Sequence, residues 1–160
     1  MSDELVLTEE RGQVLLMTLN RPNDMNAFNT PLAIALGETL EAFDANPDMR
    51  VGVLTGAGRG FSAGMDLKQF AEGGLGGMPT VAGRRFACIT EKSCAKPLIA
   101  AVEGFALAGG LETALSCDLI VASKGAKLGV PEVGVGLFAG AGALVRLPRQ
   151  LPYSIAMEMA

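Results

Sequence analysis

Hydrophobic residues recur along the chain at two spacings, and together they predict strands that alternate with helices. Short runs rich in apolar residues are typical of buried strands. Such runs predict strands at 4–9, 13–19, 51–55, 97–102, 118–122 and 126–130. The Arg11-Gly12 pair predicts a turn between the first two strands. Because strands alternate with helices, the predicted class is α/β with crossover connections.

The clearest helical pattern follows Thr30-Pro31. Threonine is a favourable cap and proline suits the first helical position, so a helix is expected to begin there. Apolar residues at helical spacing give this helix one buried face: Leu32, Leu36, Leu40 and Phe43. Asn46-Pro47 is predicted to end it. Further helices are predicted from Asp66, over 80–93, over 109–117 and from about 140, whereas the glycine-rich segment 73–79 is predicted to have little order.

Composition favours one packed domain that spans residues 1–160. Hydrophobic residues make up 49% of the 160-residue chain and charged residues only 19%, which argues against disorder. The net charge is −4 and no basic stripe is present, so no nucleic-acid partner is expected. The sequence shows no apolar run long enough to span a membrane and no signal peptide at its acidic start. With three scattered cysteines read as reduced thiols, these features predict a cytoplasmic protein.

The chain contains no histidine, which removes several mechanisms at once. The usual Ser-His-Asp and Cys-His arrangements need an imidazole to carry the proton, and common zinc sites also use it, so no metal site is expected. The stretch from Gly60 to Gly64 matches the G-x-S-x-G pattern of a nucleophile elbow. Without histidine, Ser62 is better explained as part of a tight glycine-rich turn. Gly56-Ala57-Gly58 leaves the dinucleotide-binding motif incomplete, which makes that function a weak alternative.

Two loops that each follow a predicted strand and open a predicted helix are candidates for binding an anionic oxygen. In the loop 106–112, two glycines allow the backbone to approach a ligand closely. The first amides of a helix are unpaired donors at the positive end of its dipole. Met65, directly after Gly64, has a similar setting. If the two loops meet in space they form an oxyanion hole; if they do not, they are ordinary glycine turns.

Two glutamates are candidates for acid–base chemistry. Glu112 lies one helical turn beyond Gly109, and Glu132 lies in the nearly uncharged stretch 128–143. A carboxyl group in apolar surroundings has a raised pKa and can exchange protons near neutral pH. A solvated surface charge is the ordinary alternative for either residue, and the apolar neighbours of Glu132 argue against it there.

Several long motifs, in order along the chain, resemble the enoyl-CoA hydratase/isomerase superfamily, the crotonases. They are Asn20-Arg21-Pro22, Asn26-Ala27, LTGAGRGFSAGMDL (54–67), KPLIAAVEGFALAGGLETALSCDLIVAS (96–123) and PEVGVGLFAGAGALVRLPR (131–149). The resemblance implies a crotonase-like spiral of repeated β-β-α units that assembles as a homotrimer or a dimer of trimers. Members of the family are longer, so a C-terminal helical portion that supports trimers is expected beyond residue 160.

The resemblance also assigns roles to residues. It implies that the backbone amides of Met65 and Gly109 form the oxyanion hole for a thioester oxygen, and that Glu112 and Glu132 are the catalytic pair. The remaining residues expected to contact the acyl-CoA substrate are Asn26, Ala27, Ala63, Gly64, Asp66, Leu67 and Lys68. Under this interpretation the serine of the G-x-S-x-G pattern has no chemical role, and Ser62→Ala is expected to be nearly silent.

Retention of both glutamates favours the addition of water to a 2-enoyl-CoA to give a 3-hydroxyacyl-CoA. Glu112 would then orient and activate the water, and Glu132 would exchange a proton at the α-carbon. No cofactor is expected, since CoA enters as part of the substrate. Isomerisation, thioester hydrolysis and decarboxylation by the same oxyanion hole stay open, as does a non-catalytic acyl-CoA-binding fragment. Ala108, Ala139, Ala143 and Val145 depart from the family pattern beside the expected acyl pocket, where they bear on chain-length preference.

Overall fold

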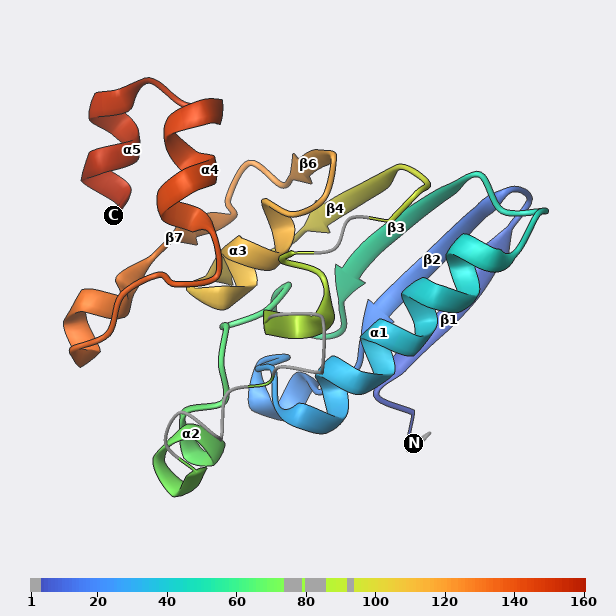
Figure 1. Ribbon diagram of the computed structural model, residues 1–160, viewed down its shortest axis with the longest axis horizontal. Helices are drawn as coiled ribbons and strands as arrows, with labels where there is room; N and C mark the ends of the chain where they lie inside the picture. The colour runs from blue at the N-terminus through green and yellow to red at the C-terminus, as the bar shows by residue number, and fades with distance from the viewer. Residues whose placement is uncertain (1–3, 74–78, 80–85, 92–93) are drawn as a thin grey trace.

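A five-stranded sheet forms the centre of the computed structural model, which describes residues 4–73, 79, 86–91 and 94–160 (Figure 1). Its strands follow the order β1-β2-β3-β4-β6. Their bounds are Val6–Arg11 (β1), Val14–Leu19 (β2), Val51–Gly56 (β3), Leu98–Val102 (β4) and Leu119–Ala122 (β6). β1 and β2 pair antiparallel, and the other neighbours pair parallel through crossovers. The predicted α/β class and the predicted strands of this sheet are therefore confirmed, but β1 begins and ends two residues later than predicted. The turn lies at Gly12-Gln13 and not at Arg11-Gly12.

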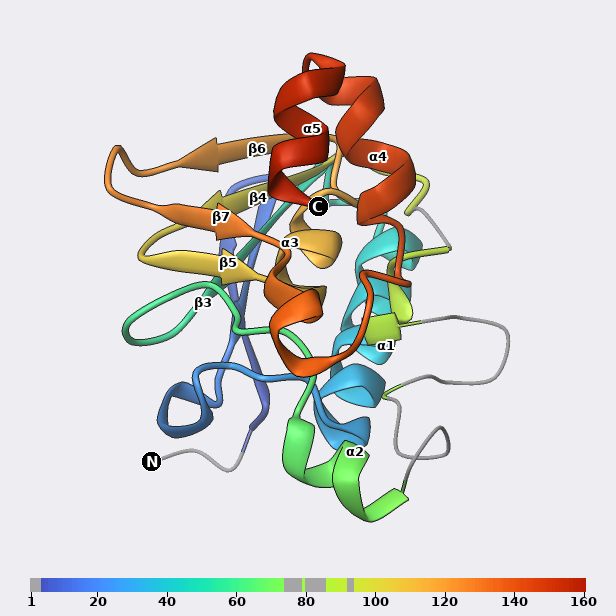
Figure 2. The same cartoon turned by 90° about the vertical axis from the view of Figure 1, so that its left-hand side faces the viewer.

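Helix α1 (Thr30–Ala45) lies along the sheet and covers one of its faces (Figures 1 and 2). The four apolar residues predicted to face the core are all at most 1% exposed. Burying each such side chain contributes about 1.5–3 kcal/mol, which fixes α1 on the sheet. The predicted cap is wrong by one residue: the side chain of Asn29 accepts a hydrogen bond from the N–H of Leu32, and Thr30 is already helical. The helix ends at Ala45 with Asn46 as its C-cap, which agrees with the end predicted at Asn46-Pro47.

A second, two-stranded sheet lies at the end of the first and leads into the next helix. β5 (Phe105–Leu107) pairs parallel with β7 (Lys127–Gly129), and helix α3 (Gly109–Ala114) begins two residues after β5 (Figure 2). The sequence predicted β7 but took β5 for part of a loop, because three residues between glycines carry too weak an alternating pattern. This short strand places the start of α3 beside the loop that follows β3.

The prediction of a helix over 80–93 is wrong for the part that can be compared. Residues 86–91 contain only the 3-10 helix η3 (Phe86–Cys88), and Ala87 and Cys88 have φ angles of 53° and 59°, which no α-helix accepts. Residues 80–85 and 92–93 of that prediction, and 74–78 of the segment expected to have little order, lie outside the described residues. The other helical elements are η1 (Pro22–Asp24), α2 (Leu67–Gly73), η4 (Pro131–Val135), α4 (Ala143–Gln150) and α5 (Tyr153–Met159).

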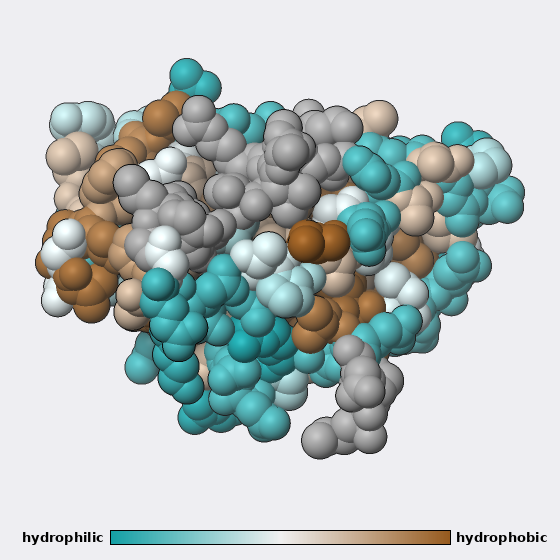
Figure 3. All heavy atoms as spheres, turned by 60° about the horizontal axis from the view of Figure 1, so that its bottom comes forward, coloured by the Kyte–Doolittle hydropathy of each residue, from teal (hydrophilic) through white to brown (hydrophobic). Residues whose placement is uncertain are grey.

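Large apolar side chains are exposed mainly in the C-terminal third of the chain. Those at least 60% exposed are Leu119, Val121, Val133, Val135, Phe138 and Tyr153. In Figure 3, hydrophobic surface gathers at the left end of the molecule, where Figure 1 places the segment after β7. Among the described residues, no helix is long and apolar enough to cross a membrane.

Candidate active site

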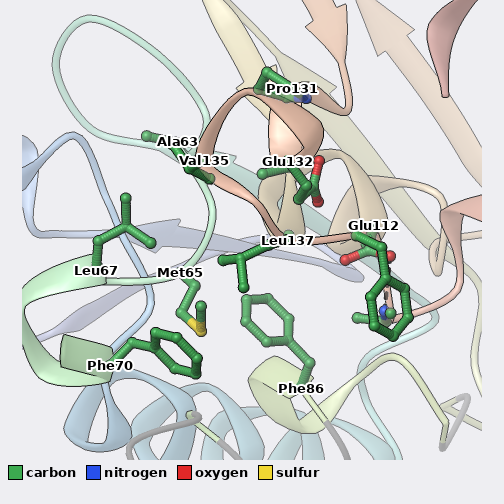
Figure 4. A pocket seen from close by; sticks show the side chains of 15 residues that line it. Ala63, Met65, Leu67, Phe70, Phe86, Glu112, Pro131, Glu132, Val135 and Leu137 are labelled. Atoms are coloured by element: carbon green, nitrogen blue, oxygen red, sulfur yellow. Dashed lines mark hydrogen bonds between the residues drawn. The ribbon is translucent and has the colours of Figure 1, made fainter. Parts of the chain in front are cut away.

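A cavity of about 380 Å³ opens where α3, η4 and the loop after β3 meet (Figure 4). Its lining includes two acidic residues in otherwise apolar surroundings. The lining residues are Ala63, Met65, Leu67, Phe70, Phe86, Ala108, Gly109, Glu112, Pro131, Glu132, Val135, Leu137, Phe138, Gly140 and Ala141. Figure 4 shows the carboxyl groups of Glu112 and Glu132 near one another, with Met65, Phe70 and Phe86 on the opposite wall. Both predicted oxyanion residues and both predicted acids thus border one space.

The backbone around Met65 leaves its N–H free to face this cavity. Phe28 donates its N–H to the carbonyl of Gly64 at 2.7 Å and accepts from the N–H of Asp66 at 2.9 Å, forming a parallel bridge opposite Met65. Successive N–H groups of an extended chain point to opposite sides, so the N–H of Met65 points away from Phe28. Within the described part of the chain, it donates no hydrogen bond.

Gly109 brings a second free N–H to the same place. It is the first residue of α3, where no helical partner exists for its N–H, and no described residue accepts from it. A Cβ built on Gly64 would lie 2.9 Å from the nitrogen of Gly109, so the two loops are in van der Waals contact. A Cβ on Gly109 itself would overlap the ring of Phe86. The loops therefore meet in space, which was the condition that the sequence left open.

Ala108 is held in a strained backbone conformation directly before Gly109. Its φ and ψ are 51° and −130°, a region that residues with a Cβ rarely adopt. Both of its backbone groups are fixed, since its N–H donates to the carbonyl of Gly129 and its carbonyl accepts from the N–H of Glu112. These two bonds, one from β7 and one within α3, set the direction in which the next N–H points. Ala108 also lines the cavity, as expected from its place in the family pattern.

Ser62 is a structural residue in this geometry. Its side chain is 0% exposed and it is not among the residues that line the cavity. The hydroxyl donates to the carbonyl of Asn26 at 2.8 Å and accepts from the N–H of Gly64 at 3.1 Å. It thereby ties the loop after β3 to the loop after β2 and shapes the turn that precedes Met65. The expectation that Ser62→Ala is silent therefore stays a prediction for the chemistry, but the two buried hydrogen bonds argue against it for stability.

We expect Ser62→Ala to keep its activity within a few-fold of wild type and to lose about 1–3 kcal/mol of unfolding free energy. The loss follows because the substitution leaves a buried N–H and a buried carbonyl without their partner. Urea unfolding measures the stability, and turnover per folded molecule measures the activity. Ser123→Ala, at an exposed serine, is the matched control and should change neither. A stable Ser62→Ala protein without activity would instead support a nucleophilic serine.

Glu112 is held in the cavity wall by backbone amides. It is 3% exposed, and its Oε1 accepts from the N–H of Ala141 at 2.8 Å and of Ala143 at 3.0 Å. Burial raises the pKa of this carboxyl group, while the amides of the turn before α4 and the charge of Arg146 oppose the rise. One oxygen is thus anchored, and the side chain reaches the cavity in a fixed orientation.

Glu132 has the opposite kind of environment. It is the second residue of η4 and 8% exposed, and its Oε2 is buried without a hydrogen-bond partner among the described residues. Burial raises the pKa of this carboxyl group, and the nearby charge of Glu112 raises it further. A carboxyl group that is costly to ionise and has a free oxygen is suited to donate a proton inside the cavity.

Comparison with known proteins assigns the family. A model of the enoyl-CoA hydratase/isomerase family matches residues 9–160. The chain belongs to this family. A crystal structure of the enoyl-CoA hydratase EchA1 from Mycobacterium marinum is 50% identical, covers 99% of this chain and superposes with a TM-score of 0.91. The crotonase-like fold predicted from the motifs is therefore confirmed.

Relatives of the chain carry different acyl groups in their names. The mevalonyl-coenzyme A hydratase SIDH of Beauveria bassiana is 43% identical over 92% of this chain. A probable enoyl-CoA hydratase of Rhizobium meliloti is 42% identical over 99% of it. The chain spans 56% and 62% of the lengths of these two relatives and 61% of the Mycobacterium marinum structure.

Some of the residues predicted to contact the substrate line the cavity, and the others do not. Ala63, Met65, Leu67 and Gly109 line the cavity, whereas Asn26, Ala27, Gly64, Asp66 and Lys68 do not. Asn26 is 1% exposed, and its amide donates to the carbonyls of Ala57 and Gly60. Its observed contacts shape the turn that precedes the loop carrying Met65. Ala27 is half-buried and Lys68 is exposed, so a longer ligand can still reach them outside the cavity.

Asp66 anchors the loop that carries Met65 from its other side. Its Oδ2 pairs with the guanidinium of Arg21 at 3.1 Å, and its Oδ1 accepts from the N–H of Lys68 at the start of α2. The same guanidinium donates to the carbonyl of Ala27. The carboxylate therefore joins the loop after β2 to the loop that carries Met65.

Sequence reasoning missed the aromatic residues of the cavity. Phe70 and Phe86 line the cavity but stand outside the family motifs, and Phe138 lies within the 131–149 motif, where the sequence assigns it no role. The ring of Phe86 packs edge-on against Phe28, with centroids 5.6 Å apart, and covers Gly109. No spacing in the sequence links these residues, because they come from three separate segments. The amides of Ala141 and Ala143 were equally invisible, since any residue except proline supplies an N–H.

Proposed function

We propose that the protein adds water to the double bond of a 2-enoyl-CoA and releases a 3-hydroxyacyl-CoA. The observation that carries this proposal is the composition of the cavity. Two free backbone N–H groups and two buried carboxyl groups face one apolar space. An oxyanion hole alone serves every reaction of the family, whereas a pair of acids matches a reaction that must move a proton from water and another to carbon.

The N–H groups of Met65 and Gly109 would hold the thioester carbonyl oxygen. Attack of water at the β-carbon moves electrons onto this oxygen, and the developing enolate needs fixed donors. Such donors do not reorganise during the reaction, and each contributes about 3–4 kcal/mol, or roughly 10²–10³ in rate. The apolar wall keeps competing water away from the same oxygen and strengthens the interaction.

The two glutamates would divide the proton transfers. Glu112, with one oxygen held by amides, has the other available to orient a water and accept its proton. Glu132, whose pKa is raised by burial, would deliver a proton to the α-carbon. The β-carbon gains OH from the water and the α-carbon gains a proton from Glu132, so the product contains one more water than the substrate. Glu112 has then gained one proton and Glu132 has lost one, and both must return to their starting states before the next turnover. Because the carboxyl groups influence each other, they titrate as a coupled pair.

The apolar lining supports an acyl thioester as the substrate class. Leu67, Phe70 and Leu137 offer hydrocarbon surface next to the acids, which suits a short or medium acyl chain. CoA would enter as part of this substrate, and the proposed reaction requires no further cofactor. A place in fatty acid metabolism would follow from that substrate class.

A homotrimer or a dimer of trimers is part of the same proposal. The exposed apolar side chains on β6, η4 and α5 supply surface that a second subunit could cover, and exposed patches of this kind often mark interfaces. Relatives are longer than this chain, so the region beyond residue 160 in a longer protein is another candidate to cover it.

The proposal is tested with crotonyl-CoA and the full-length protein. We expect the enoyl absorbance to disappear and the product to gain the mass of one water. Glu112→Gln should lower the rate by about 10²–10⁴-fold, the contribution expected of a general acid or base, while acetoacetyl-CoA still binds. Release of free CoA would indicate a thioester hydrolase instead. A shifted double bond without a gain in mass, measured with a 3-enoyl-CoA, would indicate an isomerase.

A further inference from the structure

Arg146 in α4 does not line the cavity itself but links two segments that do. One of its guanidinium nitrogens, Nη2, donates to the carbonyl of Thr90 at 2.6 Å, and the other, Nη1, donates to the carbonyl of Ala141 at 3.2 Å. Thr90 follows η3, which carries Phe86, and Ala141 belongs to the turn before α4. The half-buried side chain thus fastens the turn to the cavity's aromatic wall.

The residue that Arg146 holds is the one that holds Glu112. Ala141 receives a hydrogen bond on its carbonyl from Arg146 and donates its N–H to Oε1 of Glu112. Ala143, two residues further along the same turn, donates to the same oxygen. Any movement of the turn therefore moves the donors that orient the carboxyl group.

The guanidinium also leaves the turn little freedom. Gly142, between the two donors, has a φ of 119°, and a Cβ built on it would overlap Nη1 of Arg146. The positive charge of Arg146 acts on Glu112 through space as well, since it opposes the rise in pKa that burial causes. Geometry and charge thus come from the same side chain.

We propose that Arg146 is a positioning residue for hydration: it fixes the turn 140–143 so that the amides of Ala141 and Ala143 hold Glu112 in its working orientation. This inference rests on the proposed function for its effect on turnover, but the linkage from Arg146 to Glu112 is independent of it. Arg146 is the first charged residue after Glu132 in the sequence and lies within the 131–149 motif, and these two signals could have drawn attention to it.

The test compares Arg146→Met, Arg146→Lys and Arg149→Met in the full-length protein. Arg149 lies one turn along α4, is exposed and lines a second pocket together with Arg146 and Thr90. It makes no hydrogen bond within the described part, so it controls for loss of an arginine. We expect Arg146→Met to lower kcat for crotonyl-CoA by about 10- to 100-fold, the effect of misplacing a catalytic group, with KM within a few-fold of wild type. Arg149→Met should match wild type in both.

The pH profile separates charge from geometry. Without the positive charge, the pKa of Glu112 rises, so the acidic limb of the kcat profile should move to higher pH in Arg146→Met. Arg146→Lys keeps a charge but cannot bond both carbonyls in the same fork. It should therefore lose kcat, and its acidic limb should move less than that of Arg146→Met, because only the displaced amides and not a lost charge raise the pKa of Glu112.

A direct titration of Glu112 by carbon NMR, without any substrate, keeps the inference testable even if the protein proves not to be a hydratase. A higher Glu112 pKa in Arg146→Met than in Arg149→Met would support the linkage whatever the reaction is. Equal Glu112 titration in these two variants would overturn the inference, and so would wild-type kcat per folded molecule in Arg146→Met. If Arg146→Met does not fold, Arg146→Lys decides by the same kcat comparison.

Discussion

Replacing Glu132 by glutamine should lower the hydration rate by about 10²–10⁴-fold while acyl-CoA binding survives. The amide has the size of the carboxyl group but cannot give up a proton to the α-carbon, so the contribution of general acid catalysis is lost. The oxyanion amides and the apolar wall are untouched, which preserves binding. Turnover of crotonyl-CoA and the affinity for acetoacetyl-CoA measure the two effects separately.

The same substitution should make the protein more stable at about pH 8. The pKa of Glu132 is raised in the folded protein, so the folded state binds this proton more tightly than the unfolded chain, where the carboxyl keeps its ordinary pKa. Below that ordinary pKa the carboxyl is neutral in both states, and wild type and variant should be alike. As the pH rises through the folded pKa, wild type must ionise a buried group and loses stability, whereas glutamine does not.

Thermal unfolding at about pH 4 and about pH 8 measures how the stability difference between Glu132→Gln and wild type changes with pH. Glu132→Gln should unfold at a higher temperature than wild type at the higher pH and at nearly the same temperature at the lower one. Glu10→Gln, at an exposed glutamate on β1, is the control and should leave both activity and the pH dependence of stability unchanged. A variant that is inactive and less stable at the higher pH would contradict the buried, raised-pKa environment of Glu132.

The sequence predicted the framework of the site because the framework follows local rules. Apolar runs located the strands of the main sheet, and helical spacing located α1 with its buried face. Glycines at strand ends marked both loops that were predicted to bind an oxyanion, since close contact between the loops requires residues without side chains. A Cβ on Gly64 or on Gly109 would overlap a neighbouring residue. The close packing of these loops therefore requires glycine at both positions, and this is why the glycines in the sequence could locate the loops.

The remaining features depend on contacts between distant segments. The N-cap of α1 is Asn29 and not the predicted Thr30. The backbone angles at the start of the helix decide which of the two side chains reaches the N–H of Leu32, and the sequence does not give those angles. The helix predicted over 80–93 does not continue through Ala87 and Cys88, where packing against α1 and Gly109 overrides propensity. The role of Arg146 likewise arises from bonds to Thr90 and Ala141, which no spacing connects.

Gly64→Ala should remove most of the activity by separating the two oxyanion amides. An alanine Cβ at this position would lie 2.9 Å from the Cβ of Ala108 and 2.9 Å from the nitrogen of Gly109, closer than real Cβ atoms approach. The φ of 100° adds backbone strain to this overlap. Because the side chain sits between the loops, relief of the overlap moves Met65 and Gly109 apart, and they can no longer share one oxygen.

We expect the turnover of Gly64→Ala to fall by at least about 10²–10³-fold, the loss associated with one oxyanion donor. Affinity for acetoacetyl-CoA should fall with it, because its enolate oxygen would use the same two amides. Gly12→Ala is the matched control: Gly12 also has a positive φ, of 63°, but a Cβ at this position would meet no atom within 4 Å, so it should lose about 1 kcal/mol of stability and no activity. Wild-type turnover by folded Gly64→Ala protein would mean that the two amides do not act together, and the oxyanion hole would have to be sought elsewhere in the cavity.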